Sequence, residues 1–303
     1  MGVIDSLSEG NIVDDAVAFA RKVAEKNDIH PQVRHLNEKV VAARGDENII
    51  SEARALAAKS RKGQFAPGKI IQCVEAAINL DDFDEGMKKE AEYFIECLLN
   101  PQREAMIHIF FGERAASKIN DVPKETQKMD INKAGIIGSG TMGGGIAMCF
   151  ANIGIPVHIV DQDEENLKRG LAAIERNYKF MVNRGRMTAE QMDKTFGLIS
   201  SGLSYKEISD VDIVIEAVYE NLDLKLEIFK KLDEVVKDDA ILASNTSGLD
   251  VDALADCTNR PDKVVGTHFF SPANIMRLLE VVRGEKTSNE TLATIMSLGK
   301  SLK

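Results

Sequence analysis

Apolar residues in the first part of the chain recur at helical spacing. Four segments show the pattern most clearly, and acidic, asparagine or proline residues that favour helix starts lie at or just before the first turn of several of them. These segments are residues 14–26, 66–80, 86–100 and 101–119. No short strand-like run alternates with them, so residues 1–118 are predicted to form a helical segment. Residues 119–131 are polar and charged, contain one proline and show no periodicity, which predicts a linker.

The period changes after the linker. Short apolar runs alternate with helix-like segments or acidic loops, a pattern typical of a parallel sheet covered on both faces. The runs are residues 133–138, 157–161, 197–202, 212–218, 240–247 and 264–271. Residues 132–303 are therefore predicted to form an α/β domain with a Rossmann-type, doubly wound parallel sheet.

A glycine-rich turn follows the first of these runs and opens a helix. Gly138, Gly140 and Gly143 have the GxGxxG spacing of dinucleotide-binding turns. Gly138 allows a tight turn, Gly140 lets the backbone approach a pyrophosphate, and Gly143 lets helix and strand pack closely. The pyrophosphate would lie at the helix N-terminus, where Thr141 and Met142 are also expected to contact the cofactor.

An acid closes the second run at the expected distance from the glycines. The Asp161 carboxylate can accept hydrogen bonds from both ribose hydroxyls of NAD and would repel the extra phosphate of NADP. The prediction is an NAD site. The alternatives are a glycine-rich turn without a ligand and a surface acid at a strand end.

Composition narrows the kind of partner and of chemistry. The formal net charge of −10 argues against nucleic acid or a membrane surface as partner. No apolar run approaches the roughly 18 residues of a membrane span, and no signal peptide is apparent. The four cysteines form no CxxC pair and the five histidines no HxxxH pair, so we expect reduced thiols and no metal site.

One histidine and one acid lie in unusually apolar surroundings. His268 ends an apolar run just before a Ser-Pro turn, and Glu280 lies in the run that follows. An antiparallel return would bring the two side chains together, with the carboxylate fixing the imidazole tautomer. His268 would then act as a general base, a role suited to an imidazole because this group ordinarily titrates near the working pH. The alternatives are a structural histidine and a surface acid.

The second part of the chain resembles the NAD domain of L-3-hydroxyacyl-CoA dehydrogenases. The resemblance rests on four motifs in order, GIIGSGTMGGGIA, DIVIEAVYENLDLKLEIFKKL, ILASNTSGL and GTHFFSPANIMRLLEVV. It implies that Ser247 hydrogen-bonds the 3-oxygen of the substrate and that Glu220 and Lys225 lie near the nicotinamide. Asn245 is expected to contact the cofactor or the backbone. As residues alone, Ser247 could be a helix cap, and Glu220 and Lys225 a helix-starting acid and a solvated lysine.

The reaction that the resemblance implies is oxidation of (S)-3-hydroxyacyl-CoA to 3-ketoacyl-CoA with NAD in fatty-acid β-oxidation. His268 takes the hydroxyl proton while NAD takes the hydride. Lys179, Arg184 and Arg186 are candidate partners for the phosphates of coenzyme A, with a solvated helix end as the alternative. The competing functions are NAD binding without catalysis and a related hydroxy-acid dehydrogenase.

The first part resembles the helical end of a crotonase-type enoyl-CoA hydratase module, as found in bifunctional β-oxidation enzymes of the peroxisomal type. The resemblance implies a hydratase site before residue 1 and a further helical domain after residue 303. We therefore expect a fragment that binds NAD normally, has weak or no dehydrogenase activity and has no hydratase activity. A bacterial cytoplasm is the expected location, with the peroxisome as the alternative; acyl chain length and oligomeric state stay open.

Overall fold

The computed structural model describes residues 6–26 and 33–302. The chain divides into two compact units, Met1–Ala116 and Ser117–Lys303. The first unit contains helices and no strand among its described residues, as predicted. The second contains every strand that the structure describes.

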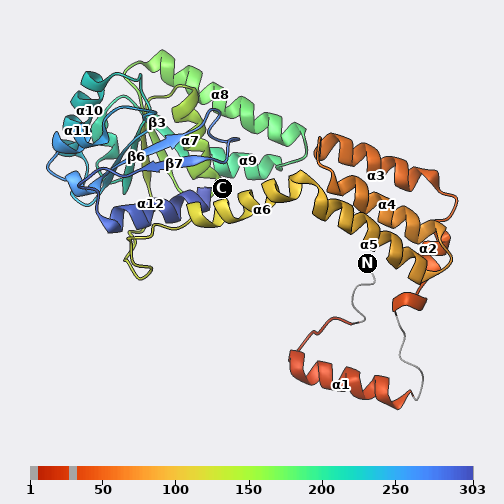
Figure 1. The fold of residues 1–303 in the computed structure, drawn as a ribbon. Helices are drawn as coiled ribbons and strands as arrows, with labels where there is room; N and C mark the ends of the chain where they lie inside the picture. The colour runs from red at the N-terminus through yellow and green to blue at the C-terminus, as the bar shows by residue number, and fades with distance from the viewer. Residues whose placement is uncertain (1–5, 27–32, 303) are drawn as a thin grey trace. The chain divides into compact units, whose positions relative to one another are not determined.

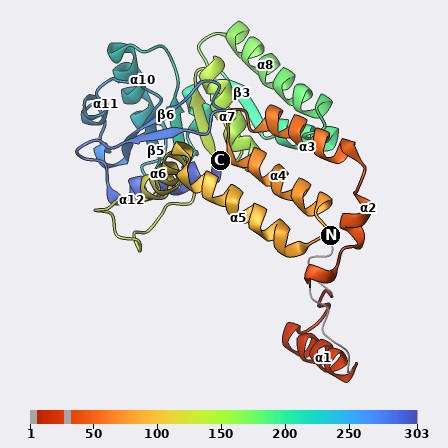
Figure 2. The same ribbon diagram turned by 45° about the vertical axis from the view of Figure 1, so that its right-hand side comes forward.

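Helices build the first unit. They are α1 (Ile12–Glu25), η1 (Val33–His35), α2 (Glu38–Ala42), α3 (Glu47–Ser60), α4 (Ala66–Asn79), α5 (Phe83–Leu99) and α6 (Pro101–Ala116). Helix α4 packs between α3 and α5 (Figure 2). The four predicted helices are confirmed, whereas α3 was not predicted, although Asp46 caps it by accepting a hydrogen bond from the backbone N–H of Asn48 at 3.0 Å.

A seven-stranded sheet forms the centre of the second unit, in the order β3-β2-β1-β4-β5-β6-β7. The strands are β1 (Ala134–Ile137), β2 (Val157–Val160), β3 (Ile199–Gly202), β4 (Ile213–Glu216), β5 (Ile241–Ser244), β6 (Val264–Phe269) and β7 (Leu279–Val282). The first six are the predicted runs and pair in parallel, and β7 pairs antiparallel with β6. The chain order reverses between β1 and β4, which places a ligand crevice at the carboxyl ends of these strands.

Helices cover both faces of this sheet, which is why its central strands are buried along their whole length (Figure 1). One core packs α7 (Thr141–Asn152), α8 (Glu164–Asn183), α9 (Ala189–Phe196) and α12 (Asn289–Leu302) against the sheet. The other packs α10 (Leu222–Val235), α11 (Val251–Asp256) and η2 (Tyr205–Ile208) against the opposite face. The short η3 (Pro261–Lys263) precedes β6. The predicted doubly wound α/β fold is confirmed.

The segment expected to be a linker has no helix or strand, but it belongs to the second unit. Ile119, Val122, Met129 and Ile131 pack against the core that contains α7. The backbone N–H of Met129 donates to Thr294 Oγ1 at 2.9 Å. Single apolar side chains at irregular spacing therefore hold this stretch, which is why it shows no period.

The glycine turn after β1 is very closely packed. Gly138 has a φ of +99°, a left-handed conformation that favours glycine. A Cβ on Gly143 would lie 1.9 Å from the carbonyl oxygen of Gly138, so the first turn of α7 rests directly on the backbone of the turn. A Cβ on Gly140 would meet nothing within 4 Å. The fold therefore requires glycine at 138 and 143, whereas Gly140 leaves open space beside the turn.

We predict that Gly143→Ala lowers the free energy of unfolding by about 3 kcal/mol, because the added methyl must displace backbone rather than a side chain. The matched variant is Gly144→Ala, where a Cβ would meet Ile174 at an ordinary 3.5 Å. It should change stability by less than about 1 kcal/mol, since alanine also favours the helix. Urea unfolding of both variants measures this, and equal losses would contradict the packing argument.

Candidate active site

The carboxyl ends of β1, β2, β4, β5 and β6 bring the predicted site residues to one edge of the sheet. Parallel strands place their carboxyl ends together, so residues distant in sequence meet there. In chain order these residues are Gly138, Gly140, Thr141, Met142 and Gly143 after β1, Asp161 after β2, Glu220 after β4, Asn245 and Ser247 after β5, and His268 on β6.

Asp161 is bound to the glycine turn. Its Oδ2 accepts hydrogen bonds from the backbone N–H and the hydroxyl of Ser139, at 2.8 and 2.6 Å. Partial burial disfavours its charge, but these hydrogen bonds outweigh burial and hold the pKa of Asp161 below its ordinary value. The carboxylate therefore stays ionised beside the turn.

The first turn of α7 is suited to an anion. Gly140 is its N-cap residue, and no acidic side chain lies in that turn. Thr141 is exposed at the helix start, whereas Met142 is half-buried and packs against the core. Gly170 of α8 was not predicted as part of this site; a Cβ there would lie 2.4 Å from the carbonyl oxygen of Ser139. This glycine lets α8 approach the turn closely.

His268 and Glu280 face each other across the β6–β7 pair. They are register partners, and Nδ1 of the imidazole lies 2.8 Å from Oε2 of the carboxylate. The predicted antiparallel return is therefore confirmed. Because a carboxylate only accepts, Nδ1 donates its hydrogen and Nε2 keeps a free lone pair. The Phe270 ring lies 4.6 Å from the imidazole centroid, tilted by 46°, and packs against the base.

Asn245 joins the ends of β5 and β6. Its side-chain Oδ1 accepts a hydrogen bond from the backbone N–H of Phe269 at 2.8 Å, and its own N–H donates to the carbonyl of Glu216 at 2.8 Å. Of the two contacts expected for Asn245, the structure has the backbone contact. This link places the turn that carries Ser247 beside the end of the strand that carries His268.

Glu220 holds the turn that contains Ser247. Its Oε1 accepts from the Thr246 hydroxyl at 2.6 Å, from the Ser247 N–H at 2.9 Å and from the Ser247 hydroxyl at 3.2 Å. Burial disfavours the charged carboxylate, but these donors and the nearby Lys225 ammonium lower the pKa of Glu220 to about 2.

Lys225 is completely buried and does not extend into the crevice. Its Nζ lies 2.9 and 2.8 Å from the two carboxylate oxygens of Glu216 and 3.2 Å from Oε2 of Glu220. Glu216 is also completely buried, and it accepts from the Val218 N–H and the Ser244 hydroxyl. Glu216 was not predicted as part of the site; the signal in the sequence is a lone acid at the end of an otherwise apolar strand.

Three basic residues lie away from this cluster. Lys179, Arg184 and Arg186 are exposed at the end of α8 and in the turn after it. Lys179 pairs with Glu175 at 2.6 Å, and the Arg184 guanidinium lies 5.1 Å from the centroid of the Phe180 ring. The structure places these residues on the surface, as expected for a solvated helix end.

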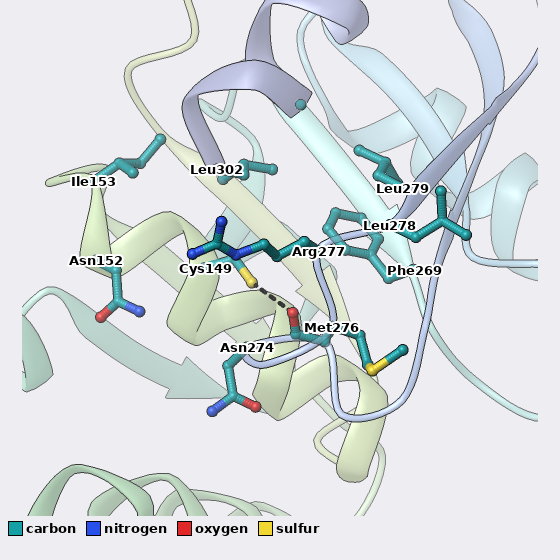
Figure 3. A pocket seen from close by; sticks show the side chains of 12 residues that line it. Cys149, Asn152, Ile153, Phe269, Asn274, Met276, Arg277, Leu278, Leu279 and Leu302 are labelled. Carbon is teal, nitrogen blue, oxygen red and sulfur yellow. Dashed lines mark hydrogen bonds between the residues drawn. The ribbon is translucent and has the colours of Figure 1, made fainter. Parts of the chain in front are cut away.

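A cavity of about 250 Å³ lies between α7, the β6–β7 connection and α12 (Figure 3). Most of its lining is apolar, with Arg277 crossing it and Cys149 donating to the carbonyl of Ala273 at 3.4 Å. His268 and Glu280 do not line it, so it is separate from the predicted catalytic pair. Over the described ranges, no three His, Cys, Asp or Glu side chains are arranged to bind a metal, and none of the helices there could span a bilayer.

Comparison with known proteins gives a family match over the second unit. The family described as 3-hydroxyacyl-CoA dehydrogenase, NAD binding domain, matches residues 133–303. The crystal structure of (S)-3-hydroxybutyryl-CoA dehydrogenase PaaH1 from Ralstonia eutropha is similar with a TM-score of 0.56 and 38% identity, covering 57% of this chain and 61% of that one.

Similarity to longer curated proteins extends over both units. The peroxisomal fatty acid beta-oxidation multifunctional protein AIM1 of Arabidopsis thaliana is 36% identical over 305 residues, covering 100% of this chain and 42% of its own length. The fatty acid oxidation complex subunit alpha of Psychrobacter cryohalolentis is 34% identical over 311 residues, with the same coverage. This chain therefore spans less than half the length of these relatives.

The low pKa of Glu220 predicts a specific pH dependence of stability. A carboxylate whose pKa falls from 4.5 to about 2 on folding stabilises the fold fully above about pH 4.5 and loses that contribution as the pH falls towards 2. We expect Glu220→Gln to remove this contribution, so that its unfolding free energy falls less steeply than that of the native chain over this range. Urea midpoints at pH 7, 4.5 and 3 measure the difference, and parallel curves would contradict it.

Proposed function

The chain belongs to the 3-hydroxyacyl-CoA dehydrogenase NAD-binding family, and on that premise we propose that it catalyses the NAD-dependent oxidation of (S)-3-hydroxyacyl-CoA to 3-ketoacyl-CoA. The observation that carries the proposal is the pairing of His268 Nδ1 with Glu280 Oε2 at 2.8 Å, at the edge of the sheet where the glycine turn opens. This chain spans 42% of the length of the two relatives named above. That a protein of their full length catalyses this reaction is part of the same proposal.

His268 supplies the proton acceptor. With Nδ1–H donated to Glu280, the lone pair of Nε2 is available for the hydroxyl proton of the substrate. The imidazolium that forms is stabilised by the Glu280 carboxylate, which also keeps the ring from turning. In the reverse direction the same nitrogen returns the proton to the 3-oxygen.

The residues after β1 and β2 fit a dinucleotide. The open space at Gly140 admits a pyrophosphate to the start of α7, and the ionised Asp161 can accept ribose hydroxyls. Bound NAD+ supplies the acceptor for the hydride that leaves C3. The close packing of Gly143 on Gly138 fixes the position of the helix N-terminus relative to the strand.

Ser247 is proposed to bind the 3-oxygen of the substrate. Its side chain is exposed on the turn that Asn245 ties to the end of β6, so the hydroxyl lies beside the base. Lys179, Arg184 and Arg186 are proposed to meet the phosphates of coenzyme A, a role that their exposure permits.

The relatives are named both as peroxisomal proteins and as subunits of a bacterial fatty acid oxidation complex. The cytoplasmic location expected from the sequence therefore stays a prediction, with the peroxisome as the alternative.

Replacing the base tests the reaction. His268→Ala should lower the rate of NADH oxidation with acetoacetyl-CoA by about 100-fold or more, because a positioned general acid–base contributes on that order. Absorbance of NADH measures the rate, with NADH binding followed by fluorescence as the control for an intact cofactor site. Turnover that survives in the variant would contradict the proposal. If the unmodified chain binds NADH but gives no turnover, the result supports the alternative function, NAD binding without catalysis.

Replacing Asp161 tests the cofactor preference. Asp161→Ala should weaken NADH binding about tenfold, since hydrogen bonds to a charged acceptor contribute more than about 1.4 kcal/mol. The same change should reduce the preference for NADH over NADPH, because it removes a carboxylate that would repel the extra phosphate of NADPH. Fluorescence titration with both nucleotides gives the ratio. Glu165→Ala, an exposed acid in the first turn of α8, is the matched control and should leave both affinities unchanged.

A further inference from the structure

A buried ion pair lies directly beneath the proposed substrate contact. The side chains of Glu216 and Lys225 are both 0% exposed. The strand and the helix that carry them also supply buried apolar side chains to one core, Val214 from β4 and Ile228 and Phe229 from α10. Buried ion pairs can often be replaced by apolar residues without loss of stability, so stability alone does not account for charges at this place.

The pair is fixed by contacts with two strands. Glu216 ends β4 and accepts from the Val218 N–H at 2.8 Å and from the Ser244 hydroxyl of β5 at 2.7 Å. Lys225, in the first two turns of α10, directs its ammonium to both oxygens of Glu216 and to Oε2 of Glu220. An ammonium has three hydrogens to donate, and these three oxygens match that number.

Glu220 connects this buried ion pair to Ser247. Lys225 holds one carboxylate oxygen, Oε2, and the other oxygen, Oε1, accepts from the backbone N–H of Ser247 at 2.9 Å. The Ser247 hydroxyl contact at 3.2 Å is longer than the usual O–H···O distance. The amide is therefore the firm anchor, and the hydroxyl can turn towards a substrate oxygen without loss of that anchor.

We propose that Glu216 and Lys225 are positioning residues that act through Glu220 to hold Ser247 in place for the substrate. The ammonium is buried between the carboxylates of Glu216 and Glu220, so it orients a carboxylate that in turn orients the serine. The inference rests on the proposed function for the role of Ser247, whereas the chain of contacts from Glu216 to the Ser247 amide can be tested without any substrate.

A pair of variants separates positioning from stability. Lys225→Met alone leaves a buried carboxylate without its cation and should lower the melting temperature by about 10 °C. The neutral double variant Glu216→Gln/Lys225→Met keeps an oxygen acceptor for the Val218 N–H, and its amide N–H can donate to the Ser244 hydroxyl, so it should restore most of that loss. If the pair positions Ser247, the double variant should regain its stability while Ser247 stays out of its native position.

Three measurements on the double variant decide the question. The Ser247 amide should exchange its hydrogen about tenfold faster, since one anchored hydrogen bond is weakened. The kcat for NADH oxidation with acetoacetyl-CoA should fall by about 100-fold, as expected for a misplaced donor to the reacting oxygen. The Kd for NADH should stay within about twofold, a small part of one hydrogen bond's contribution, because both side chains of the pair are buried away from the surface that a cofactor can reach.

Each outcome has a distinct meaning. Native exchange and native kcat in the double variant would make the pair purely structural and overturn the proposal. A rise in the Kd for NADH in proportion to the loss of kcat would show that Lys225 contacts the cofactor, and would also overturn it. If the native chain has no turnover, the proposed function fails, yet the exchange of the Ser247 amide still decides the positioning role.

Two further variants keep the test interpretable. Glu220→Ala removes the last link at a partly exposed position, so the chain should fold, and it should give the same faster exchange at Ser247 even if the double variant is unstable. Slow, native exchange in Glu220→Ala would overturn the proposal. The matched control is Glu227→Gln/Lys231→Met, an exposed ion pair at 2.6 Å on the same helix, which should leave melting, exchange and kcat unchanged.

Discussion

The close crossing of α7 over the turn after β1 is the constraint on which the rest of the site depends. A Cβ on Gly143 would lie 1.9 Å from the carbonyl oxygen of Gly138, so at this point the backbone of the helix packs directly on the backbone of the turn. That contact fixes where the first N–H groups of α7 point, and hence where an anion can bind. Gly170 repeats the principle from α8, which allows Ser139 to be enclosed and to hold Asp161 with two hydrogen bonds.

Three carboxylates at the same edge of the sheet differ in their environment, and their proposed roles follow from it. Asp161 is held ionised by neutral donors, among them the backbone N–H and the hydroxyl of Ser139 in the glycine turn. Glu220 is held ionised by neutral donors and by a buried cation, so it can anchor a backbone amide. Glu280 is half-exposed and has the imidazole of His268 as its partner, so it can respond to the charge that forms on that ring.

The sequence predicts those parts of the site that depend on local spacing. The glycine turn and Asp161 follow from distances along one strand-helix-strand unit, and the meeting of His268 with Glu280 follows from an antiparallel return of twelve residues. The burial of Lys225 could not be predicted in the same way, because a lysine on a helix with many charged residues is usually solvated. Its burial depends on Glu216 and Ser244, which lie on two different strands. Helix α3 was missed although its cap and its alanine-rich composition were present, and residues 119–131 show no period because they pack through isolated side chains.

The proposed chemistry requires a fixed distance between His268 and Ser247, and the side chain of Asn245 connects the segments that carry them. His268 is oriented by Glu280 from the edge strand, and Ser247 is oriented by Glu220 from the opposite side. These two sets of contacts share no residue. They meet where Asn245 accepts from the Phe269 N–H at 2.8 Å, next to the base on one side and two residues before the serine on the other. Because a displacement of about 1 Å can lower a rate by about 100-fold, this contact and the pairing of β5 with β6 together set how well the base and the serine act together.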